Sequence, residues 1–410
     1  MKKSLKRIMG LGLVLSLTIA SLVGCGTKDT KVKEDTTGVE DAADVEDTAD
    51  VADTADTAEN TDLQTFLIGG IGPLSGGAAS YGMSVKQGAE IAVKEINAAG
   101  GVTVGAEKVM LDLNFMDDEA TVDKAVTSFY ALMDAGADAI LGTVTSGACL
   151  GIIDLTKEEG ILQLTPSGSA QGITVNDNTF RLCFTDPLQG VTMADFAVEE
   201  LGYKKIAIIY NNSDEYSTGM MDAFVSEVEA KGGSIVASES FVTDDVDFNT
   251  QLTSIKATDA EIIFVPAYYN DAAYITTQAA DLGMNLPFIG GDGWDGVLAQ
   301  VVDPAVLEGA IFLSPFLATD ENAAVQAFVT EYNTQYGVTP DQFAADGYDS
   351  VYVFKAAMEK AASTASADMI AAMTQINVKG LTGDVTFSAE GEPNKGAKFI
   401  EIKGGAYTAR

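Results

Sequence analysis

The sequence predicts an α/β fold with two successive domains, each built on a parallel β-sheet that is doubly wound by helices. Three observations support this prediction. Short apolar segments of strand length alternate with amphipathic segments of helix length from residue 65 onward. The same alternation starts again after Pro187. The chain has 410 residues, 47% of them hydrophobic, which is enough for two domains of ordinary size.

The first run of elements begins with an apolar strand at 65–71 and a helix at 83–98. One face of this helix carries Val85, Ala89, Ala92, Val93 and Ile96, and a Gly-Gly pair at 100–101 ends it. Next is a strand at 109–115, in which apolar and polar residues alternate. The remaining elements of this run are helices at 121–135 and 147–159, and strands at 138–141 and 161–164.

The second run contains strands at 205–210, 234–241 and 261–265, and helices at 215–231, 248–257 and 271–282. Because each strand is followed by a helix, we expect neighbouring strands to be parallel. In open sheets of this kind, ligands bind outside the carboxyl ends of the strands. The loops that directly follow strands are therefore where a binding site is expected.

The first 62 residues differ in composition from the rest. Residues 1–24 combine a basic start with an apolar segment at 8–20, as in a secretory signal peptide. Cys25 directly follows Leu-Val-Gly, which resembles a bacterial lipobox, so we expect Cys25 to be lipidated; an ordinary secretory signal is the alternative. Residues 25–62 are rich in Asp, Ala and Thr without any aromatic residue. We expect a disordered acidic linker there rather than a long helix.

The net charge of −36 makes binding to nucleic acid or to anionic lipid through charge unexpected. No stretch outside the signal peptide has the length and hydrophobicity of a transmembrane helix. Besides Cys25, the chain contains Cys149 and Cys183. We expect two buried free thiols, although the spacing alone leaves a disulfide open.

Several kinds of chemistry are excluded by residue type. The chain has no histidine, which removes Ser-His-Asp and Cys-His catalysis and every histidine-based zinc site. Gly142 and Gly147 have Walker A spacing, but Ala148 and Cys149 stand where Lys and Ser or Thr are required. A GxGxxG motif starting at 70 lacks its last glycine. The sequence therefore predicts neither a nucleotide cofactor nor a metal.

Serine residues in the post-strand loops are better explained by binding than by catalysis, because no Ser-x-x-Lys or histidine supplies a base. Ser146 stands where a helix begins, and free backbone N–H groups there attract a carboxylate. A simple N-cap role for Thr145 or Ser146 is the alternative. Ser167 and Ser169 follow the next strand, so the two loops are expected to converge on one carboxylate.

A complementary charge is expected from the second domain. Asp292 lies between glycines in GGDGW, directly after a strand, where its carboxylate is placed to meet a ligand ammonium; an Asx-turn is the alternative. Tyr268, Tyr81 and Trp294 would make the site amphipathic, although each aromatic residue taken alone is more often part of a core. An enzyme on this scaffold is the less favoured interpretation.

At these residues the sequence resembles a known family, the type I periplasmic binding proteins, and within it the leucine/isoleucine/valine-binding group of ABC transporters. The resemblance covers 63–410 and includes GPLSGGAASYG, LGTVTSG, EEGILQLTPSGSA, VPAYYNDAA and FIGGDGWD. It implies two α/β lobes joined by three crossovers, with a ligand cleft between them. The N-terminal lobe would comprise 63–186 and 315–387, and the C-terminal lobe 187–314 and 388–410.

The resemblance also implies roles for individual residues toward a bound amino acid. Ser146 would bind the α-carboxylate through its hydroxyl and N–H, Ser167 would contribute mainly its backbone, and Ser169 its hydroxyl. Tyr268 and Asp292 would bind the ammonium from the opposite lobe. Tyr81 and Tyr216 would line the cleft, Thr145 would border the side-chain pocket, and Trp294 would be a neighbour of the site.

The implied function is that of an extracytoplasmic solute-binding lipoprotein. It would capture an amino acid, branched-chain or otherwise aliphatic, and deliver it to an ABC permease by lobe closure. We expect a monomer on the outer face of the cytoplasmic membrane, attached only through its lipid anchor. The alternative is a lipoprotein that senses an amino acid or an amide and reports to a signalling partner, which the sequence does not separate from transport.

Overall fold

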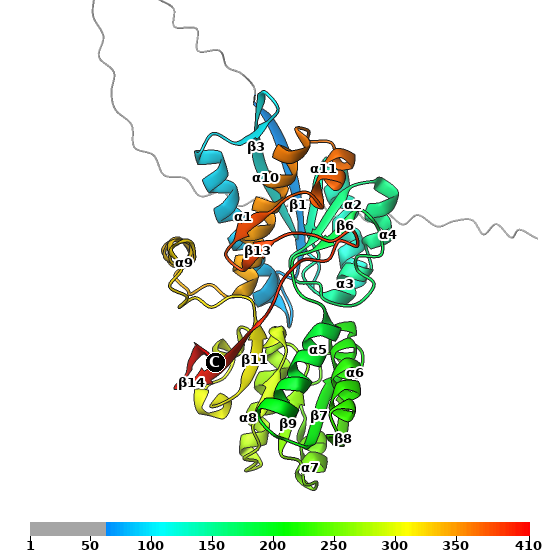
Figure 1. Cartoon of the computed structure of the whole chain (residues 1–410), viewed down its shortest axis with the longest axis vertical. Helices are drawn as coiled ribbons and strands as arrows, with labels where there is room; N and C mark the ends of the chain where they lie inside the picture. Colours follow the sequence, from blue (N-terminus) through cyan, green and yellow to red (C-terminus); the bar gives the residue numbers. More distant parts are fainter. Residues whose placement is uncertain (1–62) are drawn as a thin grey trace, which may run out of the picture. The chain divides into compact units, whose positions relative to one another are not determined.

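The computed structural model describes residues 63–410. The predicted signal peptide, the lipidated Cys25 and the acidic linker lie outside the described residues. Two β-sheets organise the described part of the chain (Figure 1). We call each sheet with its helices a lobe. In residues 63–410, no helix combines the length and the hydrophobicity needed to cross a membrane.

The first lobe contains a six-stranded sheet in the order β2-β3-β1-β4-β5-β6. Its strands are β1 (Gln64–Gly72), β2 (Val102–Val104), β3 (Glu107–Asp117), β4 (Ala139–Gly142), β5 (Leu162–Thr165) and β6 (Thr179–Arg181). Its early helices are α1 (Ala79–Ala98), α2 (Val122–Asp134), α3 (Ser146–Leu150) and α4 (Ile153–Glu159). β1 pairs in parallel with β3 and β4, and only the edge strand β2 is antiparallel. Helices cover both faces, so β4 and β5 are buried throughout.

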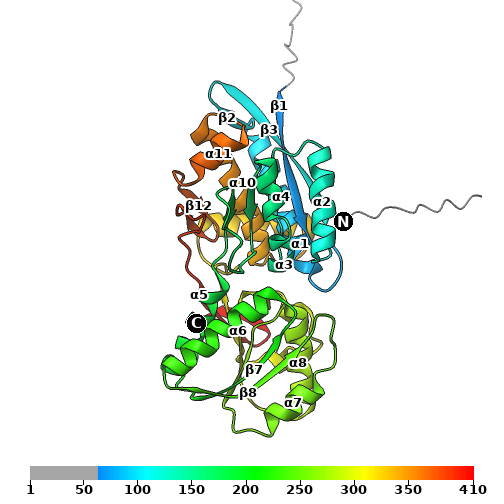
Figure 2. The ribbon, with the colours of Figure 1, turned by 90° about the vertical axis from the view of Figure 1, so that its right-hand side faces the viewer.

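The second lobe contains a seven-stranded sheet in the order β15-β14-β11-β10-β9-β7-β8. Its strands are β7 (Lys205–Asn211), β8 (Ser234–Phe241), β9 (Ile262–Val265), β10 (Phe288–Gly290), β11 (Ile311–Ser314), β14 (Lys398–Lys403) and β15 (Ala406–Ala409). Its helices are α5 (Asp186–Asp195), α6 (Glu215–Ala230), α7 (Asn249–Lys256) and α8 (Tyr269–Asp281). Figure 2 shows these helices on both sides of the sheet. β14 and β15 are antiparallel additions at one edge.

The chain returns to the first lobe after β11 and adds α9 (Ala323–Tyr336), α10 (Gln342–Ala361), α11 (Ser366–Met373) and the hairpin β12–β13 (Val378–Gly380, Gly383–Val385). It passes between the lobes three times, between β6 and α5, between β11 and α9, and between β13 and β14. Helices α1 and α10 pack closely at two glycines. A Cβ on Gly88 would lie 1.8 Å from the Ala344 carbonyl oxygen, and one on Gly347 would lie 2.1 Å from that of Val85.

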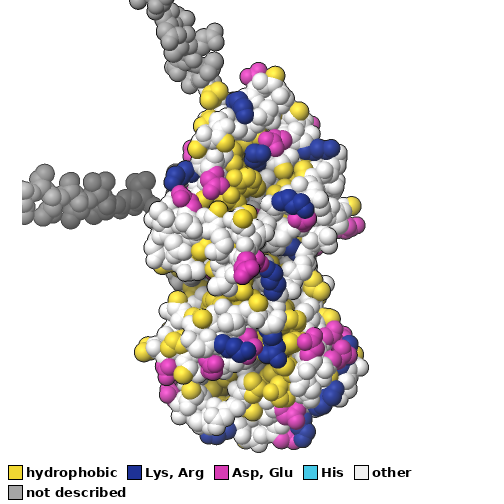
Figure 3. Space-filling model, turned by 60° about the vertical axis from the view of Figure 1, so that its left-hand side comes forward, with side chains coloured by type: hydrophobic (Ala, Val, Ile, Leu, Met, Phe, Trp, Pro, Cys, Tyr) yellow, Lys and Arg dark blue, Asp and Glu magenta, His cyan; other side chains and the backbone are white. Residues whose placement is uncertain are grey.

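The predicted fold class is confirmed, since two parallel sheets wrapped by helices follow each other along the chain. One predicted element is wrong. The helix expected at 147–159 is two helices, α3 and α4, separated at Gly151 and Ile152. Gly151 packs so tightly that a Cβ there would lie 2.6 Å from Val122 Cγ1, and Ile152 turns into the core beneath α2. On the face of the molecule shown in Figure 3, acidic and basic side chains are scattered, and the basic ones form no continuous patch.

Candidate functional site

The post-strand loops of both lobes meet at one small cavity. Two loops come from the first lobe, after β4 and β5, and two from the second, after β9 and β10. Eight residues that the sequence analysis singled out line it: Tyr81, Thr145, Ser146, Ser167, Ser169, Tyr216, Tyr268 and Asp292. The cavity volume is about 10 Å³, about enough for one water molecule. Side chains from the two lobes therefore fill most of the space between these loops.

Ser146 is the first residue of α3 and is almost completely buried. Its Oγ accepts hydrogen bonds from the backbone N–H groups of Ser169 and Ala170, both at 3.1 Å. Since these bonds use the lone pairs of the hydroxyl, its proton remains to be donated to a ligand. The N–H groups at the start of α3 also have no acceptor within their own helix. The first lobe thus offers an O–H and N–H donor set suited to a carboxylate.

Hydrogen bonds join the two serine-containing loops, the one after β4 and the one after β5. Ser167 Oγ donates to the Val144 carbonyl at 2.6 Å, and Thr165 Oγ1 donates to the Thr143 carbonyl at 2.6 Å. The buried Arg181 reinforces the second loop, because its Nη1 donates to the carbonyls of Gly168 (3.2 Å) and Ala170 (3.0 Å). These bonds fix the position of the loop before any ligand arrives. They also use the proton of the Ser167 hydroxyl, so toward a ligand this side chain can only accept a hydrogen bond, and any N–H donor from Ser167 must come from its backbone.

Asp292 brings a carboxylate to the cavity from the second lobe. It follows β10, begins a short 3₁₀ helix (η2, Asp292–Trp294) and is 5% exposed. Gln189 Nε2 donates to Asp292 Oδ1 at 3.0 Å, and the Asp292 N–H donates to Gln189 Oε1 at 2.9 Å. Burial raises the pKa of Asp292 to about 6, although hydrogen bonds from Gln189 and Tyr216 oppose that rise. At neutral pH the cavity therefore contains an ionised carboxylate, and no Lys or Arg lines it.

Three tyrosines form the aromatic wall of the cavity. The rings of Tyr216 and Tyr268 stack with centroids 5.0 Å apart, and Tyr81 meets Tyr268 edge-on at 5.5 Å. The Tyr81 hydroxyl joins the lobes, since it donates to the Gly293 carbonyl and accepts from the Tyr269 N–H. Burial raises the pKa of all three phenols well above 10, so they stay neutral.

Thr145 contributes a hydroxyl without a partner. It is 5% exposed, and its Oγ1 forms no hydrogen bond with the described residues. It is the N-cap residue of α3 in position, but its side chain makes no capping bond. A buried hydroxyl without a partner weakens the folded state. Because Thr145 Oγ1 has no partner among the described residues, it is available to form a hydrogen bond with a ligand in the cavity.

Trp294, expected as a neighbour of the site, adjoins the lining residue Gly293, and several lining residues were not predicted. Trp294 does not line the cavity, because it is fully buried in the core and its Nε1 donates to the Val265 carbonyl. The lining residues that were not predicted are Val144, Gly293 and Phe343. Val144 and Gly293 adjoin predicted residues, but Phe343 lies in α10, where no local pattern marked it. Gln189, which orients Asp292, was also missed.

The cysteines and possible metal ligands add no further chemistry here. Cys149 and Cys183 are unpaired and buried, as predicted. Burial raises the pKa of the Cys149 thiol to about 11 and that of Cys183 well above its ordinary value, which makes both thiols unreactive. Within residues 63–410, no group of three or more His, Cys, Asp or Glu residues is arranged to hold a metal ion.

Two doubly wound lobes with a small cavity between their loops have the architecture of a solute-binding protein. Residues 65–406 match the periplasmic binding protein family, and the chain belongs to this family. It is 30% identical over 329 residues, 79% of this chain and 88% of the relative, to Leu/Ile/Val-binding protein homolog 3 of Brucella melitensis.

Solved structures show the same fold. The substrate-binding protein LivJ of a branched-chain amino acid transporter from Streptococcus pneumoniae, in complex with isoleucine, has a TM-score of 0.79 and 31% identity; the match covers 85% of this chain and 99% of LivJ. A solute-binding protein of an ABC transporter from R. palustris, in complex with benzoate, has a TM-score of 0.75 and 25% identity, covering 84% and 95% of the two chains. The family fold thus accommodates ligands with and without an amino group.

Proposed function

We propose that this protein captures a free amino acid, branched-chain or otherwise aliphatic, in the cavity between its lobes. One observation carries the proposal: Ser146 and Asp292 line the same cavity from opposite lobes. The O–H and N–H donors at Ser146 suit the α-carboxylate, and the Asp292 carboxylate suits the α-ammonium. A zwitterion satisfies both ends. A carboxylate without an amino group leaves the buried Asp292 charge unpaired, which is costly.

The walls of the cavity favour an aliphatic side chain. Val144, Phe343 and the tyrosine rings present apolar surface, and no Lys or Arg lies among the lining residues to pair with an acidic side chain. Apolar walls with a few directed polar groups are typical of small-molecule sites. The isoleucine complex of LivJ is consistent with such a ligand.

Binding requires the lobes to move. The cavity of about 10 Å³ is far smaller than any amino acid, so a ligand enters only when the lobes part and the contacts of Tyr81 with Gly293 and Tyr269 break. We propose that the carboxylate first docks on the Ser146 loop and that the ammonium then recruits Asp292 and Tyr268. Because the ligand binds both lobes, it shifts the population toward the closed form.

We further propose that the closed protein delivers its ligand to an ABC permease on the outer face of the cytoplasmic membrane, to which lipidated Cys25 anchors it. LivJ and the R. palustris protein, both described as binding proteins of transporters, support the permease, and the lipobox-like residues before Cys25 support the anchor. Replacing Cys25 with Ser should move the full-length protein from the membrane fraction to the soluble extracytoplasmic fraction. Retention of the Cys25→Ser protein in the membrane would contradict the lipid anchor.

The ligand class is tested by calorimetry of the full chain with L-isoleucine and with 3-methylpentanoate, which is isoleucine without its amino group. We expect isoleucine to bind and 3-methylpentanoate to bind at least about a hundredfold more weakly, because Asp292 would be left unpaired. Benzoate serves as an aromatic carboxylate control. Tighter binding of either amine-free carboxylate than of every amino acid would contradict the proposal.

A further inference from the structure

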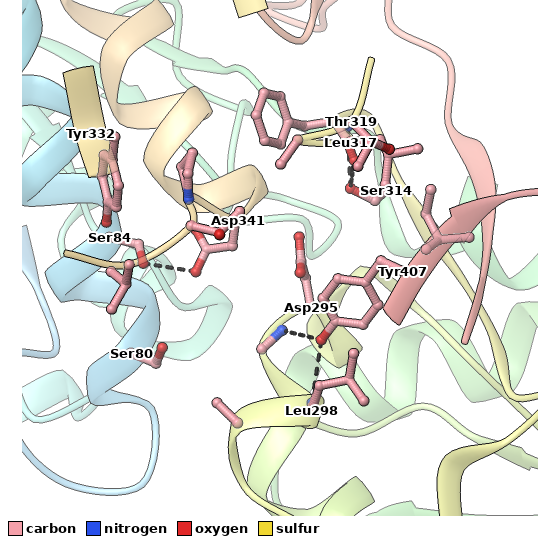
Figure 4. Close-up of a pocket in the computed structure, with 18 of the residues that line it drawn as sticks. Ser80, Ser84, Asp295, Leu298, Ser314, Leu317, Thr319, Tyr332, Asp341 and Tyr407 are labelled. Carbon is pink, nitrogen blue, oxygen red and sulfur yellow. Dashed lines mark hydrogen bonds between the residues drawn. The ribbon is translucent and has the colours of Figure 1, made fainter. Parts of the chain in front are cut away.

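A second and larger cavity lies between the lobes, beside the crossover from β11 to α9. Its volume is about 530 Å³, and it shares no lining residue with the first cavity. The first lobe contributes α1, α9 and the segment 338–341. The second lobe contributes β11, the edge strands β14 and β15, and a short 3₁₀ helix (η3, Val297–Ala299). We call it the crossover cavity (Figure 4).

Most of the wall of the crossover cavity is apolar. Met83, Leu298, Phe312, Leu317, Val338 and Ile400 are among its lining residues. A wall of this kind favours a hydrocarbon group, because burying that group removes apolar surface from water. The wall alone gives no reason for a charged ligand.

Two carboxylates on the two sides of the cavity supply that reason. Asp295, in the second lobe, is 5% exposed, and its carboxylate extends into the space that faces Asp341 and Ser314 in Figure 4. Its Oδ2 accepts a hydrogen bond from the Gln342 N–H at 2.9 Å. Asp341, in the first lobe, accepts from Ser84 Oγ at 2.7 Å and from the Ala344 N–H at 2.9 Å.

These two carboxylates have no basic partner. No Lys or Arg is among the lining residues, and neither Asp295 nor Asp341 takes part in an ion pair within residues 63–410. Burial, and after it the negative charge of Asp341, raises the pKa of Asp295 to about 8, so near neutral pH the two acids together carry about one negative charge, enough for one ammonium. Two acids that face one cavity without a cation make that cavity electrostatically complementary to a positive ligand.

We propose that the crossover cavity binds a small organic cation, a primary ammonium with a short hydrocarbon body. The ammonium group lies between Asp295 and Asp341, and the hydrocarbon body packs on the apolar wall. A bare metal ion fits the site less well, because the described residues bring no third acid, His or Cys to it and much of the wall offers no ligand atoms. An anionic ligand would be repelled by the negative charge that Asp295 and Asp341 carry together, and a neutral ligand would leave that charge uncompensated.

The site is connected to the first cavity through Gln342. Its backbone N–H donates to Asp295, and its Nε2 donates to the Asp292 carbonyl at 2.7 Å. A cation that holds Asp295 and Asp341 together also holds the two lobes together. We therefore expect the cation to tighten amino acid binding, and the amino acid to tighten cation binding by the same factor. This coupling rests on the proposed function, whereas the cation site does not.

The test uses calorimetry of the full chain with three probes of similar shape: cyclohexylammonium, cyclohexanol and cyclohexanecarboxylate. We expect cyclohexylammonium to bind at least about tenfold more tightly than cyclohexanol, and cyclohexanecarboxylate not to bind. Equal binding of the cation and the alcohol would overturn the charge assignment. No heat from cyclohexylammonium up to the millimolar range would overturn the site itself.

Single substitutions of the two acids test whether the cation binds in the crossover cavity. Asp295→Asn and Asp341→Asn should each weaken cyclohexylammonium binding at least about tenfold, because each removes a charge partner while keeping the side-chain shape. Asn is also a good N-cap, so Asp341→Asn preserves the start of α10. Asp222→Asn, at an exposed position on α6, is the matched control and should bind the probe as the unmodified protein does. Thermal melts verify that each variant is folded.

One further outcome separates the two cavities. If cyclohexylammonium binding is lost in Asp292→Asn and kept in both Asp295→Asn and Asp341→Asn, the cation occupies the first cavity and the proposal is wrong. A different result would contradict the proposed function, namely that isoleucine does not bind when cyclohexylammonium is absent. The two proposals can therefore fail independently.

Discussion

Gln189 and Asp292 are joined by two hydrogen bonds, one from the Gln189 side-chain amide to Asp292 Oδ1 at 3.0 Å and one from the Asp292 N–H to Gln189 Oε1 at 2.9 Å. Gln189 lies on α5, the first helix after the chain enters the second lobe, and is fully buried. It thus fixes the carboxylate that we propose to hold the ligand ammonium. The orientation of Asp292 depends on a residue that itself does not line the cavity.

We predict that Gln189→Ala weakens isoleucine binding about tenfold, because the Asp292 carboxylate loses a hydrogen bond that orients it and favours its charged form. Calorimetry at pH 7.5 measures the change. The control is Gln300→Ala, at an exposed glutamine of the same lobe, which should leave the Kd unchanged. An unchanged Kd in Gln189→Ala would show that Asp292 needs no such support.

Ligand affinity should fall below about pH 6. The pKa of Asp292 is raised to about 6 by burial, so the free protein carries a neutral Asp292 below that pH. A neutral carboxyl group does not attract an ammonium, and binding must then expel a proton. We expect isoleucine affinity to be flat between about pH 7 and 8 and to fall about tenfold per unit well below pH 6. Calorimetry across pH 5 to 8 tests this, and Asp292→Asn should abolish the slope.

The unpaired hydroxyl of Thr145 predicts an unusual stability effect. Thr145→Val removes a buried oxygen that bonds to none of the described residues, so the free energy of unfolding should stay the same or rise by up to about 1–3 kcal/mol. The neighbouring Thr143 is the matched control. Its hydroxyl donates to the Thr145 carbonyl at 3.0 Å, so Thr143→Val should lower stability by about 1–3 kcal/mol. Urea unfolding without ligand compares the two, and equal losses would contradict the assignment.

Arg181 should matter for the loop that carries Ser167 and Ser169. It is 1% exposed, lies 3.0 Å from a Glu392 carboxylate oxygen and donates to two carbonyls of that loop. Arg181→Met removes these donors, so we expect a loss of about 3 kcal/mol in stability and weaker isoleucine binding. Chemical unfolding and calorimetry measure the two effects. Full stability in Arg181→Met would show that the loop holds its position without the guanidinium.

The positions of the site residues could be predicted where each follows a strand. Ser146, Ser167 and Asp292 end up at one cavity because the carboxyl ends of parallel strands face the same side of their sheets. Periodicity also located most helices and strands. It failed at 147–159, since a helix broken by the tight packing of Gly151 on Val122 has the same apolar pattern as a continuous one.

Other features depend on long-range contacts that no local pattern encodes. Phe343 reaches the cavity only because α10 returns to the first lobe and packs on α1 through Gly88 and Gly347. Trp294 stands in the motif that carries Asp292, yet its indole turns into the core and donates to the Val265 carbonyl. Composition does not distinguish an aromatic residue of a pocket from one of a core.

The most direct test of the account is the isoleucine affinity of the Asp292→Ala variant, measured by calorimetry at pH 7.5 beside the unmodified full-length protein. Removing the carboxylate leaves the ligand ammonium buried without a counter-charge, which costs about 3–5 kcal/mol. We predict a Kd that is weaker by two to four orders of magnitude, at about 1.4 kcal/mol per tenfold change. A Kd within about twofold of the unmodified protein would contradict the claim that a zwitterion bridges Ser146 and Asp292.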